Sequence, residues 1–143
     1  MKYRCMQISD YEPVIQLWRN CEGLSLRDAD SRDGIEKYLE RNPGLSYVAE
    51  DDAQIFGSIM AGHDGKRGYI QHLAVDPALR KRGVATKLVD LCLDALKSQG
   101  IDKSHVHVLK KNQAGRAYWS SRGWNRRAEI VMYSFINGDN ENT

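Results

Sequence analysis

Residues Asp76–Val89 read DPALRKRGVATKLV and place three cations and a glycine directly before an apolar pattern of helical period. The first N–H groups of a helix have no acceptor within the helix and lie at its positive end, so this junction is suited to bind phosphate. Gly83 allows the main chain to approach an anion closely, and the small Ala85 leaves the space in front of the amides free. A diphosphate suits this arrangement better than a single carboxylate.

The spacing R-x-x-G-x-A is a weak signal alone, because a basic turn before any surface helix matches it by chance. Its surroundings strengthen it, since a strand-like run, His72–Val75, precedes the loop and an amphipathic pattern follows it. No GxGxxG follows a strand and no GxxxxGK[ST] occurs, which excludes the dinucleotide and P-loop kinds of phosphate site.

Length and composition indicate one globular domain. A chain of 143 residues buries roughly two thirds of its unfolded surface when it folds. The composition, with 41% hydrophobic and 28% charged residues, is ordinary for such a domain. We expect the domain to cover residues 1–136, and the polar residues 137–143 to form a disordered tail.

Three cysteines, Cys5, Cys21 and Cys92, match neither a zinc-site spacing nor a CxxC pair, so we expect no metal and no disulfide. They are expected to be buried as small apolar groups in a reducing compartment. No run of about 18 apolar residues occurs, and the N-terminus lacks the apolar core of a signal peptide. The sequence therefore predicts a cytoplasmic protein without membrane association.

Charge is divided along the chain. Residues 1–65 carry seven Lys and Arg against twelve Asp and Glu, a net charge of −5, whereas residues 66–127 carry fourteen against four, a net charge of +10. The basic part is suited to face an anion, and the acidic part either balances it or faces a cation. Differently charged solvated surfaces are the simpler alternative.

Hydrophobic periodicity predicts four helices and six strands in the order β-α-α-β-β-β-α-β-α-β. The period of the apolar pattern changes from two residues to 3.6 after Val75. The sequence does not decide whether a further short strand forms at Trp124. The predicted strands are 3–8, 45–50, 55–62, 68–75, 105–108 and 130–136, and the predicted helices are about 11–21, 33–41, 85–99 and 112–122.

Two blocks carry a resemblance to a known family. HLAVDPALRKRGVATKLV, residues 72–89, resembles the acetyl-CoA signature of the GNAT superfamily of N-acyltransferases, and NQAGRAYWSSRGW, residues 112–124, resembles its second block. The order of elements agrees from Tyr3 to Ile136. The resemblance implies an α/β (α+β) fold: a single GNAT-like domain with a mixed, mostly antiparallel sheet of six to seven strands, flanked by about four helices. The sheet would splay between its fourth and fifth strands, with coenzyme A in the opening and the amine on the opposite side.

By the same resemblance, the main chain of the fourth strand binds the pantetheine amides and a main-chain N–H near Val75 polarises the acetyl carbonyl. The loop amides hold the pyrophosphate, and the loop cations add attraction that salt screens. Asn112 would contact the pantetheine or direct the helix beside it. The implied acetyl-CoA site consists of Leu73, Ala74, Val75, Arg80, Lys81, Arg82, Gly83, Val84, Ala85, Thr86, Asn112 and Trp119.

The chain departs from the family at the residue that protonates the leaving thiolate. The family has a tyrosine seven residues after the Asn, where this chain has Trp119, whose indole is not usefully acidic. Tyr118 is one residue earlier, about 100° away on a helix. Either Tyr118 substitutes, or water does, or the thiolate leaves unassisted because its pKa of about 8.5 is already low.

Two residues are candidates for the base that deprotonates the amine, His72 on the fourth strand and Glu50 at the end of the second. Tyr69 and Gln71, which alternate onto the other face from His72, are predicted to line the amine pocket. The acidic segment 22–33, with Glu22, Asp28, Asp30 and Asp33, is predicted to attract a cationic acceptor, although a solvated acidic loop explains it equally well.

The sequence therefore predicts an acetyl-CoA-dependent N-acetyltransferase that acts on an amine of a small molecule or protein by direct transfer, since no cysteine falls in the motifs. The alternative is a coenzyme A-binding module of the same fold without turnover. A nucleic-acid partner is not expected, because the cations cluster at one helix start instead of interleaving with aromatic residues. Whether two copies form a homodimer stays open.

Overall fold

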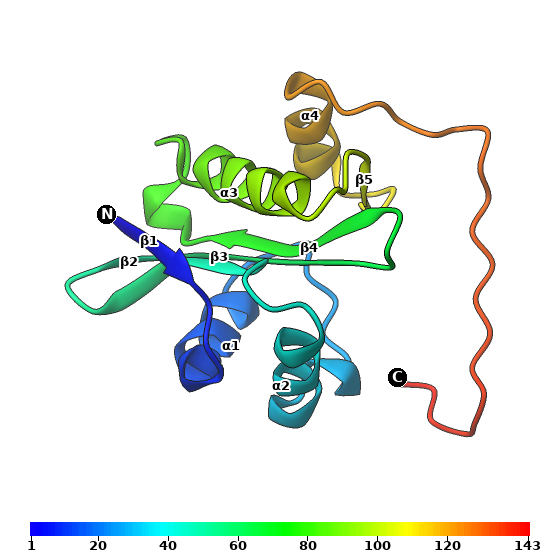
Figure 1. Ribbon diagram of the computed structural model, residues 1–143, viewed down its shortest axis with the longest axis horizontal. Helices are drawn as coiled ribbons and strands as arrows, with labels where there is room; N and C mark the ends of the chain where they lie inside the picture. Colours follow the sequence, from blue (N-terminus) through cyan, green and yellow to red (C-terminus); the bar gives the residue numbers. More distant parts are fainter.

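Five strands form one sheet in the order β1-β2-β3-β4-β5 in the computed structural model, which describes residues 1–143 (Figure 1). Strands β1 to β4 are antiparallel neighbours, and β5 runs parallel to β4. The strands are β1 Lys2–Cys5, β2 Tyr47–Asp51, β3 Gln54–His63, β4 Gly68–Val75 and β5 Ser104–Val106. The helices are α1 Tyr11–Arg19, α2 Arg32–Arg41, α3 Val84–Ser98 and α4 Gln113–Ser121, with short 3-10 turns η1 Ile8–Asp10, η2 Asp28–Asp30 and η3 Pro77–Leu79.

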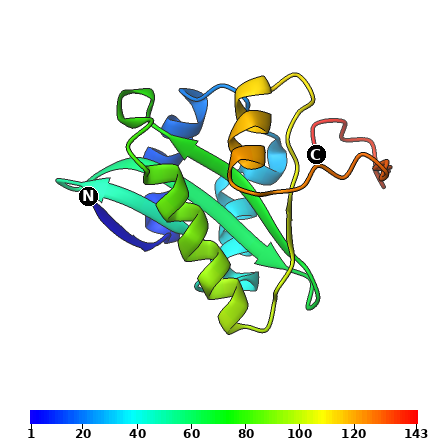
Figure 2. The same cartoon turned by 90° about the horizontal axis from the view of Figure 1, so that it is seen from above.

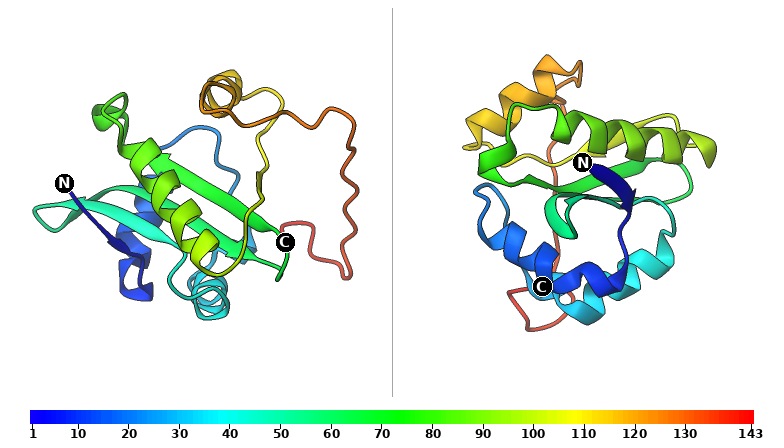
Figure 3. Two further views of the ribbon diagram at one scale, coloured as in Figure 1. Left: turned by 45° about the horizontal axis from the view of Figure 1, so that its top comes forward. Right: turned by 90° about the vertical axis from the view of Figure 1, so that its left-hand side faces the viewer.

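The helices cover both faces of the sheet. α1 and α2 lie on one face, and α3 and α4 lie on the other (Figures 1 and 3). Residues of β2 show the alternation that builds both cores, since Val48 packs with α1 while Ala49 packs with α3. Trp18 and Leu88, both almost fully buried, lie in these two cores. None of the helices combines the length and apolar content needed to cross a bilayer.

The four predicted helices and the first five predicted strands are confirmed, with boundary shifts of a few residues. The prediction of six to seven strands is wrong, because Ile130–Ile136 has no partner strand and Trp124 lies outside any strand. The apolar pattern of 130–136 is strand-like, yet a strand forms only where another strand accepts its hydrogen bonds. Cys5 is exposed because it lies on the edge strand β1, whereas Cys21 and Cys92 are buried as expected.

A β-bulge in β4 shapes the middle of the sheet. The β3–β4 register passes from Met60↔Gln71 to Ser58↔Ala74, so one residue of β3 lies opposite His72 and Leu73. His72 has a φ of 52°, in the left-handed region that side chains rarely adopt. Such outliers are kept where the surroundings fix them, and they are common at active sites.

An ion cluster fixes the start of the chain to the sheet. Arg4 donates to both carboxylate oxygens of Asp10, at 2.8 Å each, and to Glu50 at 3.1 Å. The Gln7 N–H also donates to Asp10, at 2.8 Å. Burial opposes the ionisation of Asp10, but the hydrogen bonds from Arg4 and Gln7 outweigh it and hold the pKa of the carboxyl below its ordinary value.

We expect Asp10→Ala to lower the free energy of unfolding by about 2 kcal/mol at pH 7, because it leaves the half-buried Arg4 guanidinium without the carboxylate that it binds through two hydrogen bonds. The lowered pKa means that this stabilisation is complete above the unfolded-state value of about 3.9 and is lost as the pH falls further. Urea unfolding at pH 7 and pH 3 measures the difference, which should shrink at pH 3. Exposed Asp90 supplies the control, since Asp90→Ala should change stability by less than about 0.5 kcal/mol at either pH. Equal losses in the two variants would contradict a structural role for the cluster.

Candidate active site

The N-terminus of α3 presents a row of free main-chain N–H groups. The first hydrogen bond of this helix runs from Lys87 N–H to the Gly83 carbonyl at 3.0 Å, and no acceptor in the protein receives the N–H groups of residues 82–86. Gly83, the N-cap, has a φ of 82°, and Lys81 has a φ of 64°. These left-handed residues turn the loop so that consecutive amides lie at the positive end of a helix, an arrangement that binds phosphate oxygens.

Strands β4 and β5 separate next to this helix start. They pair only between Gly68–Ile70 and Ser104–Val106, so the rest of β4, from Gln71 to Val75, has no strand beside it on that side. The main-chain groups that point to that side can bind an extended amide-bearing molecule, except the Val75 carbonyl, which accepts a hydrogen bond from the Arg80 side chain. In Figure 2, α3 lies across the sheet and α4 stands beside it, and the unpaired part of β4 lies in the same region.

Tyr118 and Trp119 of α4 have different surroundings. The Tyr118 hydroxyl lies 3.2 Å from the Thr86 hydroxyl in the first turn of α3, where it borders the row of free amides. Trp119 is 8% exposed and packs edge-to-face on Trp124, with ring centroids 4.7 Å apart. Trp119 therefore contributes to the α3-side core that supports this turn.

Arg80 is bound by the protein itself. Its side chain donates to the Val75 carbonyl at 3.1 Å and to the Glu22 carboxylate at 2.8 Å. Both partners hold the guanidinium against the end of β4, and the pair with Glu22 is the main reason that the pKa of Arg80 is raised. Arg80 therefore joins the loop at Glu22 to the loop that precedes α3. Lys81 and Arg82, in the same loop as Arg80, form no ion pair.

Asn112 caps α4 and contacts the acidic loop. Its side-chain oxygen accepts the Gly115 N–H at 2.9 Å. A Cβ added at Gly23 would lie 2.8 Å from the Asn112 amide nitrogen, so the two segments are in close contact. The α3 start, the free part of β4, the loop at Glu22–Gly23 and the start of α4 therefore meet around one region.

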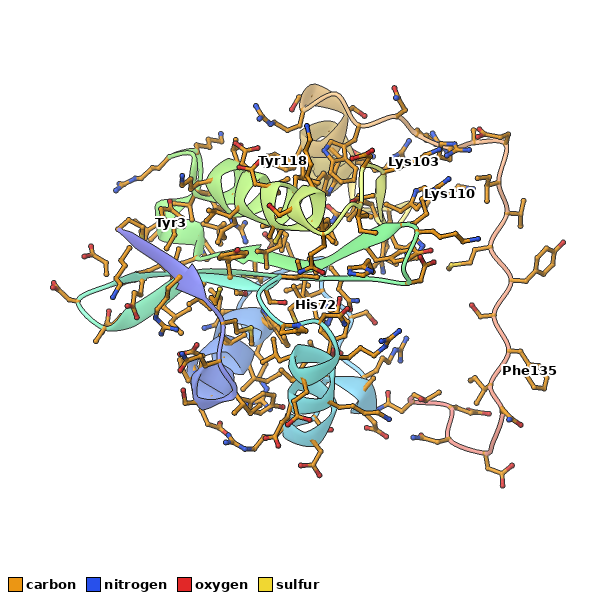
Figure 4. The ribbon with its side chains drawn as sticks, in the orientation of Figure 1. Tyr3, His72, Lys103, Lys110, Tyr118 and Phe135 are labelled. Atoms are coloured by element: carbon orange, nitrogen blue, oxygen red, sulfur yellow. The ribbon has the colours of Figure 1, made fainter.

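His72 lies on the opposite side of the sheet from Tyr118 (Figure 4). Its Nε2 is 2.7 Å from the Asp30 carboxylate, and its ring lies 4.7 Å from that of Trp18. Trp18 is fixed in turn by a 2.8 Å hydrogen bond from its indole to Ser58. Burial opposes the ionisation of Asp30, but hydrogen bonds from His72 and the Arg27 N–H lower its pKa overall. The arrangement is an imidazole oriented by a carboxylate, which is how proteins position a base.

Gln71 lies on the same face as His72, contrary to the prediction from strict alternation. The Gln71 amide donates to Tyr38 of α2 at 3.2 Å, whereas His72 contacts η2 and α1. The bulge adds one residue to β4 and so turns both side chains toward the α1–α2 face. The Tyr69 ring lies beside the His105 ring at a tilt of 43°, with centroids 5.8 Å apart, and the Tyr69 hydroxyl donates to Asp64 at 3.4 Å.

Glu50 and Asp28, which the sequence also predicts for the site, bind other residues than His72. Glu50 is paired with Arg4 and Lys2 beside β1, which lowers the pKa of its carboxyl through the hydrogen bond from Arg4. Asp28 accepts hydrogen bonds from the amides of Asn140 and Asn142, which lower its pKa.

The pairing of Asp30 with His72 is a feature that the sequence does not predict. The sequence indicates Asp30 only as one of four acids in its segment, and 42 residues separate it from His72. No local pattern indicates such a contact.

Comparisons with known proteins agree with this fold. The family model described as "Acetyltransferase (GNAT) family" matches residues 11–124. A curated acetyltransferase of Pectobacterium atrosepticum is 38% identical over 114 residues, which cover 80% of each chain. A Clostridium acetobutylicum protein described as an acetyltransferase and solved with acetyl-CoA superposes with a TM-score of 0.75, at 20% identity over 93% of this chain and 95% of that one. AAC(6')-Iy, solved with a bisubstrate analogue, CoA-S-monomethyl-acetylneamine, gives a TM-score of 0.74 at 20% identity over 94% and 97% of the two chains.

The match of a family model over most of the chain and the identity to a curated acetyltransferase agree with the two sequence blocks at residues 72–89 and 112–124. The chain belongs to the GNAT family of acetyltransferases.

Proposed function

We propose that this protein is an acetyl-CoA-dependent N-acetyltransferase that transfers an acetyl group to a primary amine in a ternary complex. The observation that carries the proposal is the row of unbonded main-chain N–H groups of residues 82–86, next to the point where β4 leaves β5. A pyrophosphate fits this row through charge-assisted hydrogen bonds. The pantetheine then follows the free edge of β4 toward His72.

The coenzyme would be held mainly by main-chain groups. Residues 82–86 would bind the phosphates, with the Thr86 hydroxyl beside them. Main-chain groups of Leu73, Ala74 and Val75 would bind the pantetheine, except the Val75 carbonyl, which Arg80 already occupies. Lys81 and Arg82 would attract the anion in a manner that salt screens. Arg80, already bound to Glu22 and Val75, would mainly hold the loop in shape.

The amine would arrive on the α1–α2 face, where Tyr69, Gln71 and His72 lie. His72 would accept the proton of the attacking amine, and Asp30 would orient the imidazole. A new C–N bond replaces the C–S bond, the coenzyme leaves as a thiolate, and the thiolate takes a proton from water. Glu50 is a weaker candidate for the base, because Arg4 and Lys2 already neutralise it.

We expect Tyr118→Phe to leave kcat within about threefold of the wild-type value and to raise the KM for acetyl-CoA about two- to tenfold. The hydroxyl contacts Thr86 at the phosphate end of the site, and loss of one hydrogen bond costs about 0.5–1.5 kcal/mol. Tyr47→Phe is the control, since Tyr47 donates to the Gly44 carbonyl away from the site and should leave both constants unchanged. If Tyr118→Phe instead slows turnover by about two orders of magnitude, this hydroxyl is the acid that protonates the thiolate.

The function as a whole is tested by the release of coenzyme A thiol from acetyl-CoA over a panel of amines. The net charge of −5 over residues 1–65 predicts faster release with cationic diamines and polyamines than with neutral or acidic amines. Mass spectrometry of the product should show a gain of one acetyl group on the amine. Tight binding of acetyl-CoA without release from any acceptor would instead favour the coenzyme A-binding module that Trp119 suggests.

A further inference from the structure

Ser58 places a hydroxyl in the apolar core between the sheet and α1. The residue is fully buried on β3, and its direct neighbours across the strands are Val48 of β2 and Ala74 of β4, which both belong to the core of the α1–α2 face. Burying a hydroxyl costs free energy unless the protein supplies a hydrogen-bond partner. The partner here is Trp18, whose indole N–H donates to the Ser58 hydroxyl at 2.8 Å.

The hydrogen bond to Ser58 fixes the orientation of the Trp18 ring. Trp18 is 1% exposed, and the indole N–H is its only polar side-chain group. Loss of the acceptor would leave this buried N–H without a partner, which favours a rotated indole. The Trp18 ring lies 4.7 Å from the His72 ring, centroid to centroid, with 54° between the two planes. A rotation of the indole therefore acts directly on the imidazole.

His72 needs this second support because Asp30 holds only one atom of its ring. The Asp30 carboxylate, whose pKa is lowered, is ionised at neutral pH and accepts a hydrogen bond from Nε2 at 2.7 Å. In the neutral imidazole, Nδ1 then carries the lone pair that accepts a proton. One hydrogen bond at Nε2 allows the ring to turn about that contact, and the Trp18 ring limits the turn.

We propose that Ser58 is a positioning residue for acetyl transfer, because it holds the Trp18 indole in the orientation that aims Nδ1 of His72 at the amine. The inference rests on the proposed function, in which His72 is the base. The proton of the amine passes to Nδ1 as the C–N bond forms, while the buried Ser58 touches neither the amine nor the coenzyme. The pair Ser58↔Ala74 also borders the bulge in β4, so one strand shapes the main chain of His72 and orients its ring.

Steady-state kinetics of Ser58→Ala tests the proposal. We expect kcat to fall about tenfold, because a small misplacement of a catalytic group slows the reaction, while the Kd for acetyl-CoA stays within about twofold of the wild-type value. Ser58→Cys keeps a similar volume with a weaker acceptor, so its kcat should lie between those of the wild type and Ser58→Ala. An unchanged kcat in both variants would overturn the proposal.

Ser46→Ala is the matched control for the loss of a buried hydroxyl. Ser46 is 2% exposed, and its hydroxyl accepts the Ala61 N–H at 3.2 Å instead of an indole. Urea unfolding should show similar losses of stability in Ser46→Ala and Ser58→Ala, but Ser46→Ala should keep kcat within about twofold of the wild-type value. Equal losses of kcat in the two variants would assign the effect of Ser58 to core stability alone and overturn the positioning role.

A double-mutant cycle shows whether Ser58 acts through Trp18. Trp18→Phe keeps an aromatic ring beside His72 but has no N–H to donate. Adding Ser58→Ala to Trp18→Phe should change kcat by less than about twofold, because the hydrogen bond is already absent. A further tenfold loss would show that Ser58 affects the rate by another route and would overturn the proposal.

The NMR signals of the His72 imidazole separate this proposal from the proposed function. In protein without substrate, Ser58→Ala should shift the Trp18 indole N–H signal and the His72 ring signals, whereas Ser46→Ala should shift neither. An indole signal that moves while the His72 ring signals stay in place would overturn the positioning role alone, and His72 would remain the base. Normal turnover by His72→Gln would instead overturn the base itself, and with it any role of Ser58 in the reaction.

Discussion

Replacing His72 with glutamine is expected to lower kcat by about 100-fold or more while the affinity for acetyl-CoA stays within about twofold of the wild-type value. The imidazole lies on the α1–α2 face, held between the Asp30 carboxylate and the Trp18 ring. Glutamine keeps a hydrogen bond to Asp30 but cannot accept the proton of the amine. Steady-state kinetics of thiol release, together with calorimetry of acetyl-CoA binding, separates the two effects.

A second histidine on the neighbouring strand provides the control. The His105 ring contacts that of Tyr69 at a tilt, and burial is the main reason that the pKa of His105 is lowered, yet His105 has no carboxylate partner. His105→Gln should change kcat by less than about threefold. Asp30→Asn should reduce kcat less than His72→Gln, because it removes the orientation of the base and leaves the base in place. If His72→Gln and His105→Gln have equal rates, His72 is not the base.

Replacing Gly83 with valine is expected to weaken acetyl-CoA binding by about 10- to 100-fold, the cost of one or two charge-assisted hydrogen bonds. Gly83 has a φ of 82°, which a β-branched residue adopts only under strain, and relaxation of that strain turns the free amides away from the phosphates. No atom lies within 4 Å of the added Cβ, so the core is not disturbed.

Gly65→Val, in the turn between β3 and β4, is the control that separates the effect of backbone strain on stability from the effect on acetyl-CoA binding. Gly65 has a φ of 95° and its Cβ position is also empty, but it lies far from the α3 start in the chain and in its contacts. Gly65→Val should lose a similar stability, about 1–2 kcal/mol, and bind acetyl-CoA normally. Equal binding by the two variants and the wild type would remove the loop before α3 from the coenzyme site.

Local chemistry makes much of this site predictable from sequence. The change of period after Val75 indicates the strand, the loop and α3, and Gly83 at the junction predicts the left-handed turn and the free amides that the structure has. The order of the first nine elements follows in the same way, because each carries its own hydrophobic period or turn residues.

Features that depend on distant contacts are not predictable in this way. The bulge at His72 comes from the pairing of β4 with β3, and it places Gln71 and His72 on one face where alternation predicts two. The Asp30–His72 contact joins η2 to β4, 42 residues apart in the chain. Residues 130–136 have the apolar composition of a strand, but whether they pair with another strand depends on the rest of the sheet.

A crystal structure of the full chain with acetyl-CoA tests the proposed site most directly. It should show the pyrophosphate oxygens within hydrogen-bond distance of the N–H groups of residues 82–86, the pantetheine along β4 from Val75 toward Leu73, and the acetyl group near His72. Coenzyme bound elsewhere, with these amides in contact with water alone, would contradict the proposed site and the function inferred from it.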